Sequence, residues 1–566
     1  MCGLAGIWSR NGSQALSENI LAAMAQAIEH RGPDDHGVWL DEQTGVGLAH
    51  RRLSILDLSP HGHQPMLSPS GRYVIAYNGE IYNFQQLRAR LDAEGQSPRW
   101  RGGSDTEVIL AAIDAWGLEQ AVRRFIGMFA FALWDRTERL LYLVRDRLGI
   151  KPLYYGWQGR SFFFGSELKA IKAHPDFKGE VDRGSLGLLL RHNYIPAPHS
   201  IYKGIHKVLP GHILTLKAGN SGEEPRSQAY WSALEAAEQG VSDPFAGSDE
   251  EAADGLDAIL RDAIKLRMIA DVPLGAFLSG GIDSSTVVAL MQAQSDRPVK
   301  TFSIGFHEKG YNEAEDAKKI ARHLGTDHTE LYVTPEEAMA VIPRLPALYD
   351  EPFSDSSQIP TFLVSELARK SVTVSLSGDG GDELFCGYPR YNLGDSVWNK
   401  MCRVPRPIRN LAAGAMSSVS VKAWDALFYP LGLVLSSKKV RVNPGDKLHT
   451  LAKILRTESP EAFYRWLVSH WKDPAQLVGA AEPPTFLSNG NVRSRLPGFL
   501  EKVMYLDTVT YLPDDILTKV DRASMGVSLE ARVPLIDHRV LEFAWRLPLQ
   551  MKFRGQENKW LLRKVL

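Results

Sequence analysis

The chain has 566 residues, 44% of them hydrophobic and 23% charged, and its formal net charge is -1. These values are ordinary for a globular protein of about two to four domains, and they exclude a general attraction to nucleic acid or to anionic membranes. No apolar run approaches the ~18 residues that a membrane span needs, and the N-terminus lacks the pattern of a secretory leader. Three cysteines are too few for a disulfide framework, so we expect a cytoplasmic protein.

The first 215 residues (1–215) are expected to form an α+β domain of packed layers. Apolar residues at helical spacing in the segment 20–28 predict an early helix. Aromatic and β-branched residues then predict strands at Tyr73–Tyr82, Phe129–Asp135 and Leu140–Asp146. The short turn between the last two strands predicts a hairpin.

Residues 216–250 are polar and rich in Gly, Ser and Pro, which is typical of a linker. Over residues 251–566, predicted strands and helices alternate, and such alternation predicts a parallel sheet with helices on both faces. The expected strands end at Ser279 and lie at Thr301–Phe306 and Val372–Ser377, with helices at Ser284–Gln294 and just before Gly325. The segment 395–500 is expected to be mostly helical.

Cys2 directly follows Met1, so removal of the methionine would make it the N-terminal residue. A terminal cysteine combines a nucleophilic thiol with an α-amino group, of pKa near ~8, that can carry the proton. The alternative for any free cysteine is a small buried apolar residue. The neighbouring motifs favour the nucleophile. A glutaminase must also stabilise an oxyanion and hold the charged groups of glutamine, and these motifs contain residues suited to both tasks.

Five further residues suit those two tasks. Asn78, at the end of an apolar strand, can donate its side-chain amide to an oxyanion, and Gly79 can donate its backbone N–H. Glu80 and Asp105 can accept from the ammonium of glutamine, while Arg52 can pair with its carboxylate. Taken one at a time, each of them could equally be a turn residue or a surface charge.

The order of these motifs resembles the class II glutamine amidotransferase domain. The resemblance rests on Cys2-Gly3, His30–Asp34 (HRGPD), His50–Asp57 (HRRLSILD), Asn78–Asn83 (NGEIYN), Gly102–Glu107 (GGSDTE), Gly127–Asp135 (GMFAFALWD) and Arg145–Tyr155 (RDRLGIKPLYY). It covers essentially the whole first domain and implies the N-terminal nucleophile fold, in which two packed sheets lie between helix layers (αββα). It also implies that Cys2 is the nucleophile and that the five residues just named form the oxyanion hole and hold glutamine.

A glycine-rich string follows the first strand of the second half and consists of Ser279, Gly280, Gly281, Ile282, Asp283, Ser284 and Ser285. Glycines let a phosphate approach the backbone, serines add donors, and a following helix presents free N–H groups at its N-terminus. Asp283 can hold Mg²⁺ against the phosphates. A capped Gly-Gly turn is the alternative, but the strand–loop–helix setting favours phosphate binding. No Walker A pattern occurs in the chain.

A second glycine-rich loop, Ser377–Glu383 (SGDGGDE), follows a later predicted strand. Its three carboxylates, Asp379, Asp382 and Glu383, repel one another unless a cation or the solvent relieves them. A solvated acidic turn is the ordinary interpretation of such a string. Beside a phosphate loop, a metal site becomes the better interpretation.

The two loops resemble those of the ATP-pyrophosphatase superfamily. Together with Ser528–Asp537 (SLEARVPLID) and Asn558–Lys564 (NKWLLRK), they are similar to the glutamine-hydrolysing asparagine synthetase family. The resemblance implies ATP and Mg²⁺, with Gly378 joining the first loop on ATP and Asp382 joining Asp283 on the metal.

The same resemblance assigns roles to two charged residues. It places Asp379 near the acceptor and its adenylate. It places Lys559 near the ATP phosphates, where a cation would stabilise the leaving pyrophosphate. Without the family, Lys559 would be interpreted as an exposed helical lysine.

The pairing of the halves predicts a glutamine-dependent amidotransferase. Glutamine would form a thioester on Cys2 and release NH3, while ATP adenylates an acceptor carboxylate. Ammonia would then cross a channel between the domains and displace AMP. The expected partners are glutamine and a carboxylic acid, and a homodimer is left open.

The identity of the acceptor stays open at this point. The stretch Tyr349–Phe362 (YDEPFSDSSQIPTF) lacks the Thr-Thr-Ile-Arg segment linked to aspartate in well-known asparagine synthetases, so it has no arginine for an aspartate α-carboxylate. Asp379 also replaces a glutamate common in those enzymes. Aspartate is one candidate; a uronic-acid sugar of surface polysaccharides or a cell-wall diamino acid is the other. The chain ends at Leu566, earlier than most members, which leaves a missing C-terminal segment open.

Three other hypotheses compete with this one. A β-lactam synthetase-like enzyme shares the second domain, but members of that group lack the N-terminal cysteine. A regulatory pseudoenzyme is opposed by the intact phosphate loop, by Asp382 and by Lys559. A stand-alone glutaminase would leave the ATP motifs without purpose.

Overall fold

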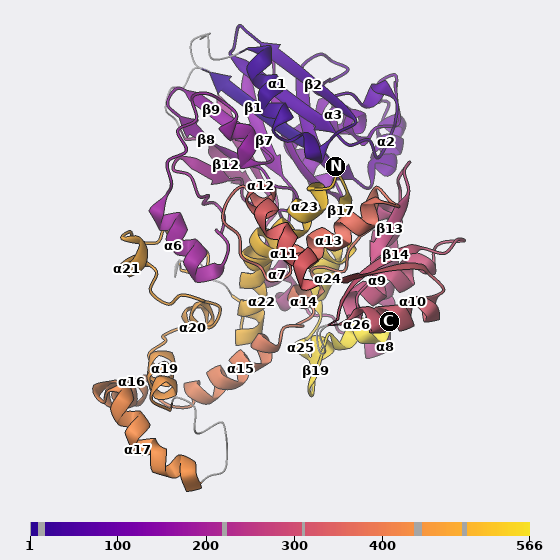
Figure 1. Cartoon of the computed structure of the whole chain (residues 1–566). Helices are drawn as coiled ribbons and strands as arrows, with labels where there is room; N and C mark the ends of the chain where they lie inside the picture. Colours follow the sequence, from indigo (N-terminus) through magenta and orange to yellow (C-terminus); the bar gives the residue numbers. More distant parts are fainter. Residues whose placement is uncertain (1, 10–16, 218–223, 308–311, 435–443, 489–494) are drawn as a thin grey trace.

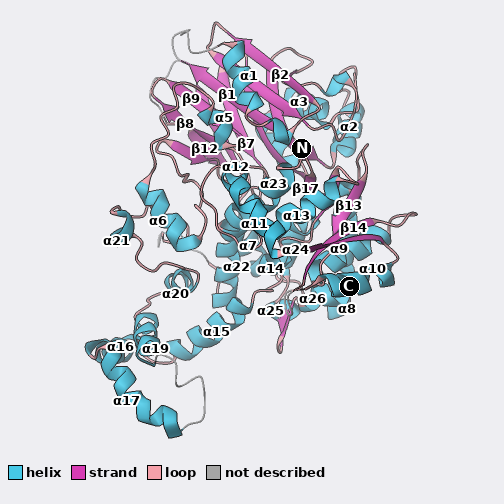
Figure 2. Ribbon diagram, viewed as in Figure 1, coloured by secondary structure: helices cyan, strands magenta, loops and turns pink. Residues whose placement is uncertain are grey.

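The computed structural model describes residues 2–9, 17–217, 224–307, 312–434, 444–488 and 495–566. Its N-terminal half is built on two antiparallel sheets, and its C-terminal half on one parallel sheet (Figure 1). Helices cover both halves, and one group of helices extends away from them (Figure 2).

The first antiparallel sheet has the strand order β10-β8-β9-β1-β3-β2. Its strands are β1 (Gly3–Ser9), β2 (Asp35–Asp41), β3 (Val46–Arg52), β8 (Tyr154–Gln158), β9 (Ser161–Gly165) and β10 (Ile205–Lys207). Strand β1 lies inside this sheet, because Ala5 pairs with Ala49 on one side and with Gly165 on the other. Helices α1 (Glu18–Gln26) and α5 (Leu168–Lys172) pack on its outer face. The start of β1, where Cys2 lies, is therefore enclosed.

The second antiparallel sheet has the strand order β12-β11-β7-β6-β5-β4. Its strands are β4 (Met66–Leu67), β5 (Tyr73–Ile81), β6 (Gly127–Asp135), β7 (Leu140–Arg145), β11 (His212–Lys217) and β12 (Arg226–Ala229). Helices α2 (Phe84–Ala93), α3 (Asp105–Trp116) and α4 (Leu118–Arg124) pack on the outer face, and helix α6 (Arg183–His192) follows later. Between the sheets, Trp8, Val74 and Trp134 share one buried core. This arrangement confirms the predicted αββα layers.

The parallel sheet has the strand order β15-β14-β13-β16-β17. Its strands are β13 (Leu274–Phe277), β14 (Lys300–Phe306), β15 (Asp327–Val333), β16 (Val374–Leu376) and β17 (Glu530–Arg532). Helices α8 (Asp249–Arg267), α9 (Ile282–Gln292) and α10 (Ala314–Leu324) pack on one face, and α13 (Gln358–Arg369) and α23 (Leu517–Met525) on the other. The predicted parallel α/β sheet is confirmed, and Gly325 ends α10 in the left-handed conformation that favours glycine.

The stretch expected to be a linker contains two regular elements. Strand β12 adds an edge to the second sheet, and α7 (Ala233–Ser242) packs against α24 (His538–Arg546). A Cβ on Gly240 would lie 2.7 Å from the backbone of Trp545, so this packing is close. Residues 218–223 lie outside the described chain. The domain limits at residues 215 and 251 stay a prediction.

The remaining helices surround the parallel sheet or extend from it. They are α11 (Pro335–Val341), α12 (Leu345–Tyr349), α14 (Gly381–Leu384), α15 (Pro389–Cys402), α16 (Arg406–Ser418), α17 (Val421–Val434), α19 (Pro444–Leu455), α20 (Pro460–Leu467), α21 (Ala475–Val478), α22 (Phe499–Val509), α25 (Leu549–Lys552) and α26 (Trp560–Val565), with a small hairpin of β18 (Phe553–Arg554) and β19 (Glu557–Asn558). None of the described helices combines the length and apolar character needed to cross a membrane.

Candidate active sites

Cys2 lies immediately before β1 and is buried, with 8% of its surface exposed. Its backbone N–H donates to Asn78 Oδ1 at 3.0 Å, and its carbonyl oxygen accepts from Arg31 Nε at 3.1 Å. Burial raises the pKa of the Cys2 thiol, against the opposing effects of the Leu53 backbone N–H and the Arg52 charge. The thiol therefore keeps its proton until a neighbouring base removes it.

Asn78 and Gly79, on β5, are brought next to Cys2. Because Asn78 Oδ1 accepts from Cys2, its Nδ2 is left as a donor, and this buried atom has no hydrogen-bond partner within the described residues. A Cβ on Gly79 would overlap the Met128 carbonyl oxygen and lie 2.7 Å from Phe129 Cα, so β5 and β6 leave room only for glycine. An unpaired buried donor beside a nucleophile is the feature that an oxyanion hole requires.

Glu80 belongs to a buried acidic cluster to which both halves contribute. Arg532 Nη2 lies 3.8 Å from Glu80 Oε1, and Arg532 Nε donates to Glu530 Oε1 at 2.6 Å. Burial, followed by the charges of Glu530 and Asp105, raises the pKa of Glu80 well above its ordinary value. Such an excess of carboxylates over cations suits the ammonium group of an amino acid. Glu530 and Arg532 were not predicted as site residues, although the SLEARVPLID string contains both.

Asp105, the third acid of this cluster, begins α3. It accepts from Tyr77 Oη at 2.8 Å and from the Ile81 backbone N–H at 2.9 Å, so it also holds β5 in place. Burial raises the pKa of Asp105 to about 6, against the effect of these two hydrogen bonds.

Arg52 is buried at the end of β3, and its guanidinium is hydrogen-bonded to the loop that follows this strand. Its guanidinium donates to the carbonyl oxygens of Ser59 at 3.0 Å and Leu56 at 3.4 Å, and also to that of Asp57. The charge of Arg52 is close enough to act on the Cys2 thiol. A glutamine carboxylate at Arg52 would therefore replace some of these carbonyl contacts.

The phosphate loop joins β13 to α9. Ser279 Oγ lies 2.8 Å from Ser284 Oγ and accepts from the Gly281 N–H at 3.1 Å, while Ser285 Oγ donates to the Gly281 carbonyl at 2.7 Å. No side chain caps the N-terminus of α9 at Gly281. The first N–H groups of this helix are therefore free to bind an anion.

The second glycine-rich loop packs directly on the first. A Cβ on Gly378 would lie 2.5 Å from the backbone nitrogen of Ser284, and a Cβ on Gly381 would lie 2.5 Å from the carboxyl group of Asp283. Both glycines are therefore required for the two loops to meet. This contact brings the carboxylates of the second loop beside the phosphate loop.

Asp283 and Asp382 meet across the ammonium group of Lys559. Lys559 Nζ lies 2.7 Å from Asp283 Oδ2 and 2.7 Å from Asp382 Oδ1. Burial raises the pKa of Asp283 to about 6, against the opposing charge of Lys559. Asp283 Oδ1 is buried and has no partner within the described chain. Two carboxylates with a spare oxygen fit Mg²⁺, which usually takes one or two protein carboxylates and completes its shell with phosphate oxygens and water.

The two loops line a cavity of about 610 Å³. Asp379 lies in its wall and accepts a hydrogen bond from the Ser377 hydroxyl. Two predicted ATP ligands do not line this cavity: Gly280 lines a neighbouring one, and Ser285 is turned into α9. The remaining predicted ATP and metal residues all line it, namely Ser279, Gly281, Asp283, Ser284, Gly378, Asp382 and Lys559.

Lys519, on α23, lines the same cavity and was missed by sequence reasoning. Its Nζ donates to Ser357 Oγ at 3.2 Å and lies 3.5 Å from Asp355 Oδ1. It supplies a buried cation to the stretch Tyr349–Phe362, which has none of its own. A lysine at the buried start of a helix was the available indication, but only the fold shows which loop it faces.

Asp515 lies behind this lysine in a π-helical turn, Leu512–Ile516. Burial and the charge of Asp355 raise the pKa of Asp515 to about 8, against the opposing charge of Lys519. Although burial opposes it, Lys519 lowers the pKa of Asp355. The two carboxyl groups therefore share one proton near neutral pH.

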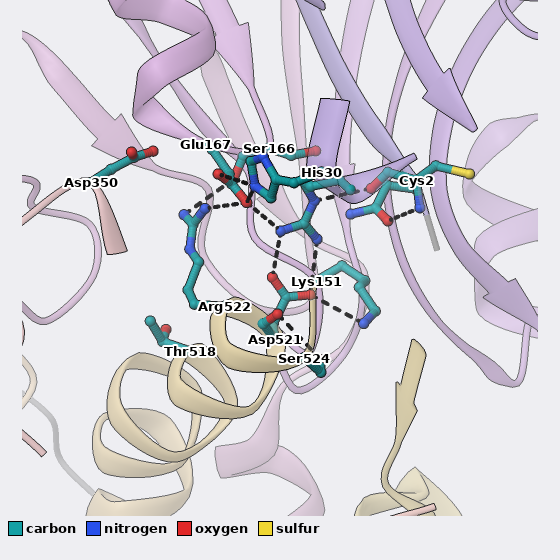
Figure 3. Close-up of polar contacts among 12 residues, drawn as sticks. Cys2, His30, Lys151, Ser166, Glu167, Asp350, Thr518, Asp521, Arg522 and Ser524 are labelled. Atoms are coloured by element: carbon teal, nitrogen blue, oxygen red, sulfur yellow. Dashed lines mark hydrogen bonds and ion pairs between the residues drawn. The ribbon is translucent and has the colours of Figure 1, made fainter. Parts of the chain in front are cut away.

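A buried ionic network joins the two halves between the sites (Figure 3). Arg31 Nη1 lies 2.6 Å from Glu167 Oε1 and 2.8 Å from Asp521 Oδ2, while Arg31 Nη2 donates to Asp521 Oδ1 at 3.0 Å. Arg522 Nη1 lies 2.8 Å from Glu167, and Lys151 Nζ lies 3.3 Å from Asp521. Since Arg31 also binds the Cys2 carbonyl, this network connects Cys2 to α23, which carries Lys519 two residues before Asp521.

A protein built in this way couples glutamine hydrolysis in one half to ATP-driven synthesis in the other, and this defines the class of ATP-dependent glutamine amidotransferases. Comparison with known families gives the same division. The glutamine amidotransferase domain family matches residues 1–231, and the asparagine synthase family matches residues 255–566. The chain belongs to the asparagine synthetase family, as its motifs predict.

Several relatives match the whole chain, among them the following three. Asparagine synthetase (glutamine-hydrolyzing) 1 of Bacillus subtilis strain 168 is 34% identical over 571 residues, covering 100% of this chain and 84% of that protein. Asparagine synthetase (glutamine-hydrolyzing) 3 of the same organism is 31% identical, with coverage of 100% and 84%. Amidase chyE of Penicillium rubens is 30% identical, with coverage of 100% and 86%.

Replacing the predicted oxyanion donor should affect only the first half-reaction. We expect Asn78→Ala to lower kcat for glutamine hydrolysis about 100- to 1000-fold, because one donor to the tetrahedral intermediate is lost. Amidation driven by added ammonium chloride should stay within about twofold of the parent protein. Parallel assays of glutamate release and AMP formation measure both effects; an equal loss of both activities would argue against this role.

The shared proton of Asp515 predicts a pH-dependent stability. The folded-state pKa of about 8 exceeds the ordinary value of 3.8, so the native protein binds a proton that the unfolded chain lacks in this window. Protonation of Asp515 therefore contributes stability that is fully present below pH 3.8 and is lost as the pH rises towards the folded-state pKa of about 8. We expect Asp515→Asn, which has no such proton, to gain stability relative to the parent between pH 5.5 and pH 8.5. Urea denaturation at each pH would measure it, and parallel profiles would refute the assignment.

Proposed function

We propose that this protein hydrolyses glutamine at Cys2, adenylates a carboxylate with ATP in the 610 Å³ cavity, and amidates it with the ammonia released. We propose aspartate as the acceptor, with asparagine as the product. The main observation behind the proposal is the network that ties the Cys2 carbonyl through Arg31 to α23, the helix that lines the ATP cavity. We further propose that the protein works in the cytoplasm, where its substrates are available.

In the first half-reaction, removal of Met1 would leave a free amine at the Cys2 nitrogen. This amine would take the thiol proton, and the sulfur would attack the side-chain amide of glutamine. Asn78 Nδ2 and the Gly79 N–H would stabilise the oxyanion. The amine would then pass the proton to the amide nitrogen, which would leave as NH3, and water would hydrolyse the remaining glutamyl thioester to glutamate.

Glutamine would be held at both charged ends of its backbone. Its ammonium group suits the acidic cluster of Glu80, Asp105 and Glu530, in which Arg532 is the cation closest to the carboxylates. Its carboxylate suits Arg52. Glu530 and Arg532 come from the second half of the chain. Glutamine bound in this site would therefore change the contacts of residues that belong to the synthetase half.

In the second half-reaction, an oxygen of the acceptor carboxylate would attack the α-phosphorus of ATP, and pyrophosphate would leave. Lys559 and the free N–H groups of α9 would stabilise the charge on the leaving group. Mg²⁺, when bound by Asp283 and Asp382, supplies charge neutralisation between the phosphates. Asp379, beside the adenylate, would accept a proton from the attacking ammonia as AMP leaves.

Aspartate fits the acceptor end of the cavity through two complementary groups. Lys519 would pair with the α-carboxylate of aspartate and would take the place of the arginine that the stretch Tyr349–Phe362 lacks. Asp355, beside Lys519, can accept from the α-ammonium. A second candidate is another carboxylic acid, since a relative named amidase chyE matches the whole chain.

Loss of the nucleophile should separate the two half-reactions. We expect Cys2→Ala to abolish glutamine-dependent formation of the amide and release of AMP, because no thioester can form, and to keep ammonium-dependent amidation at the parent rate. The measurement is AMP, pyrophosphate and amide formed with Mg-ATP and either nitrogen source. Cys386→Ala, a second buried cysteine, is the matched control and should keep both activities. Loss of ammonium-dependent activity in folded Cys2→Ala would contradict the coupled scheme.

Lys519 should set the affinity for the acceptor. We expect Lys519→Gln to raise the KM for aspartate about 30-fold or more, because a buried charge partner is lost, and to change kcat far less. Lys502→Gln, in α22 and away from this cavity, is the control. The assay should also include N-acetylated uronic-acid sugars and diamino acids. Turnover with one of those acids and none with aspartate would replace aspartate as the acceptor and keep the amidotransferase chemistry.

A further inference from the structure

Helices α16, α17 and α19 form a projection that stands away from both sheet systems, at the lower left of Figure 1. Within the projection, α16 and α17 each pack against α19, and α15 connects it to the rest of the second half. None of the residues proposed for glutamine, ATP or the acceptor lies in it. The amidotransferase reaction therefore leaves this part of the chain without a role.

The projection carries a concentrated positive charge. Its described residues, 400–434 and 444–459, include eight lysines and arginines but only three acidic residues. From chain totals of 65 basic and 66 acidic residues, this leaves 57 basic and 63 acidic residues elsewhere. A net charge near zero thus conceals a basic projection on an acidic body. Several of these cations are exposed to solvent, among them Arg403, Lys422, Lys447 and Lys453.

One face of α16 exposes large apolar side chains instead of burying them. Ile408 and Leu411 are 56% and 76% exposed, and their spacing of three residues places them in one row of the helix. Val404, which is 40% exposed, lies just before the helix begins. We call this row the apolar stripe. The opposite face of α16 packs inward, where Arg409 and Ala413 are buried. The helix therefore has a buried face, and the exposed apolar row is an additional feature on its outer side.

Together, the apolar stripe and the cations indicate which kind of surface the projection can bind. A surface that combines exposed apolar side chains with lysines and arginines, here contributed by neighbouring helices, is the pattern of segments that lie in the interface of an anionic membrane. Nucleic acid would use the cations but would leave Ile408 and Leu411 in water. We propose that this projection docks the protein on an anionic lipid surface, with the apolar stripe at the level of the headgroups and the cations on the lipid phosphates.

This docking would also orient the protein. The acidic remainder of the chain is repelled by the surface that attracts the projection, so the body would stand off from the bilayer. Both reaction sites would stay in water near the membrane. The proposal adds a location to the proposed function and does not depend on the identity of the acceptor.

Binding to lipid vesicles tests the proposal with the full chain. We expect co-sedimentation with vesicles of phosphatidylcholine and phosphatidylglycerol, but not with phosphatidylcholine alone, and weaker binding at high salt. Ile408→Glu combined with Leu411→Glu should lower the partition about tenfold or more. The control is Met339→Glu, which alters a side chain that is 57% exposed on α11, outside the projection.

A second pair of variants tests the charge. Lys422→Glu combined with Lys447→Glu should lower binding to the anionic vesicles about tenfold, while Lys319→Glu, an exposed lysine on α10, should leave it unchanged. Glutamine hydrolysis should be equal in all variants, which separates this proposal from the catalytic one. Absence of binding to anionic vesicles would overturn the proposal. Vesicle binding that Ile408→Glu combined with Leu411→Glu leaves unchanged would also overturn it. A dimer that Leu411→Glu disrupts, in a protein that does not bind lipid, would overturn it as well.

Discussion

The buried ion pair between Arg31 and Asp521 is the interaction on which the arrangement of both sites depends. Charges taken out of water are tolerated only when partners of opposite sign surround them. Arg31 belongs to the antiparallel half and Asp521 to the parallel half, and both side chains are at most 3% exposed. Separating the halves would leave buried charges without compensation, so the two sites have a defined mutual position. Through the Cys2 carbonyl at one end and α23 at the other, this pair links the proposed nucleophile to the cavity proposed for the acceptor.

The two proposed sites differ in their balance of positive and negative charges, and this difference suits them to different ligands. In the glutamine site, carboxylates outnumber nearby cations, which raises the pKa of Glu80 and suits an incoming ammonium group. In the ATP site, Lys559 lies between Asp283 and Asp382, where phosphates and a divalent cation would rearrange these contacts. The closeness of the two glycine-rich loops makes this possible, since a side chain at Gly378 or Gly381 would force them apart.

The same contrast between local and global charge appears at the surface. The near-zero net charge of the chain argues against a general attraction to anionic membranes, and that argument holds for the molecule as a whole. It does not hold for the projection, where the described residues among 400–459 include eight basic and three acidic ones. The electrostatic potential at a surface depends on the charges within about a Debye length, ~8 Å at physiological salt, so the average over the chain says little about one projection.

The sequence by itself determined what depends on local patterns. Strands β5, β6 and β7 follow from their aromatic and β-branched residues, and α10 ends where Gly325 permits the left-handed conformation. The motifs around Cys2 and around Asp283 identify the family because their residues are close together in the chain. Three important residues could not be found in this way. Glu530, Arg532 and Lys519 reach their sites only because β17 and α23 fold back against the antiparallel half and the stretch Tyr349–Phe362. Periodicity and motif spacing report on neighbours along the chain, whereas these contacts join segments that only the packing of the two halves brings together.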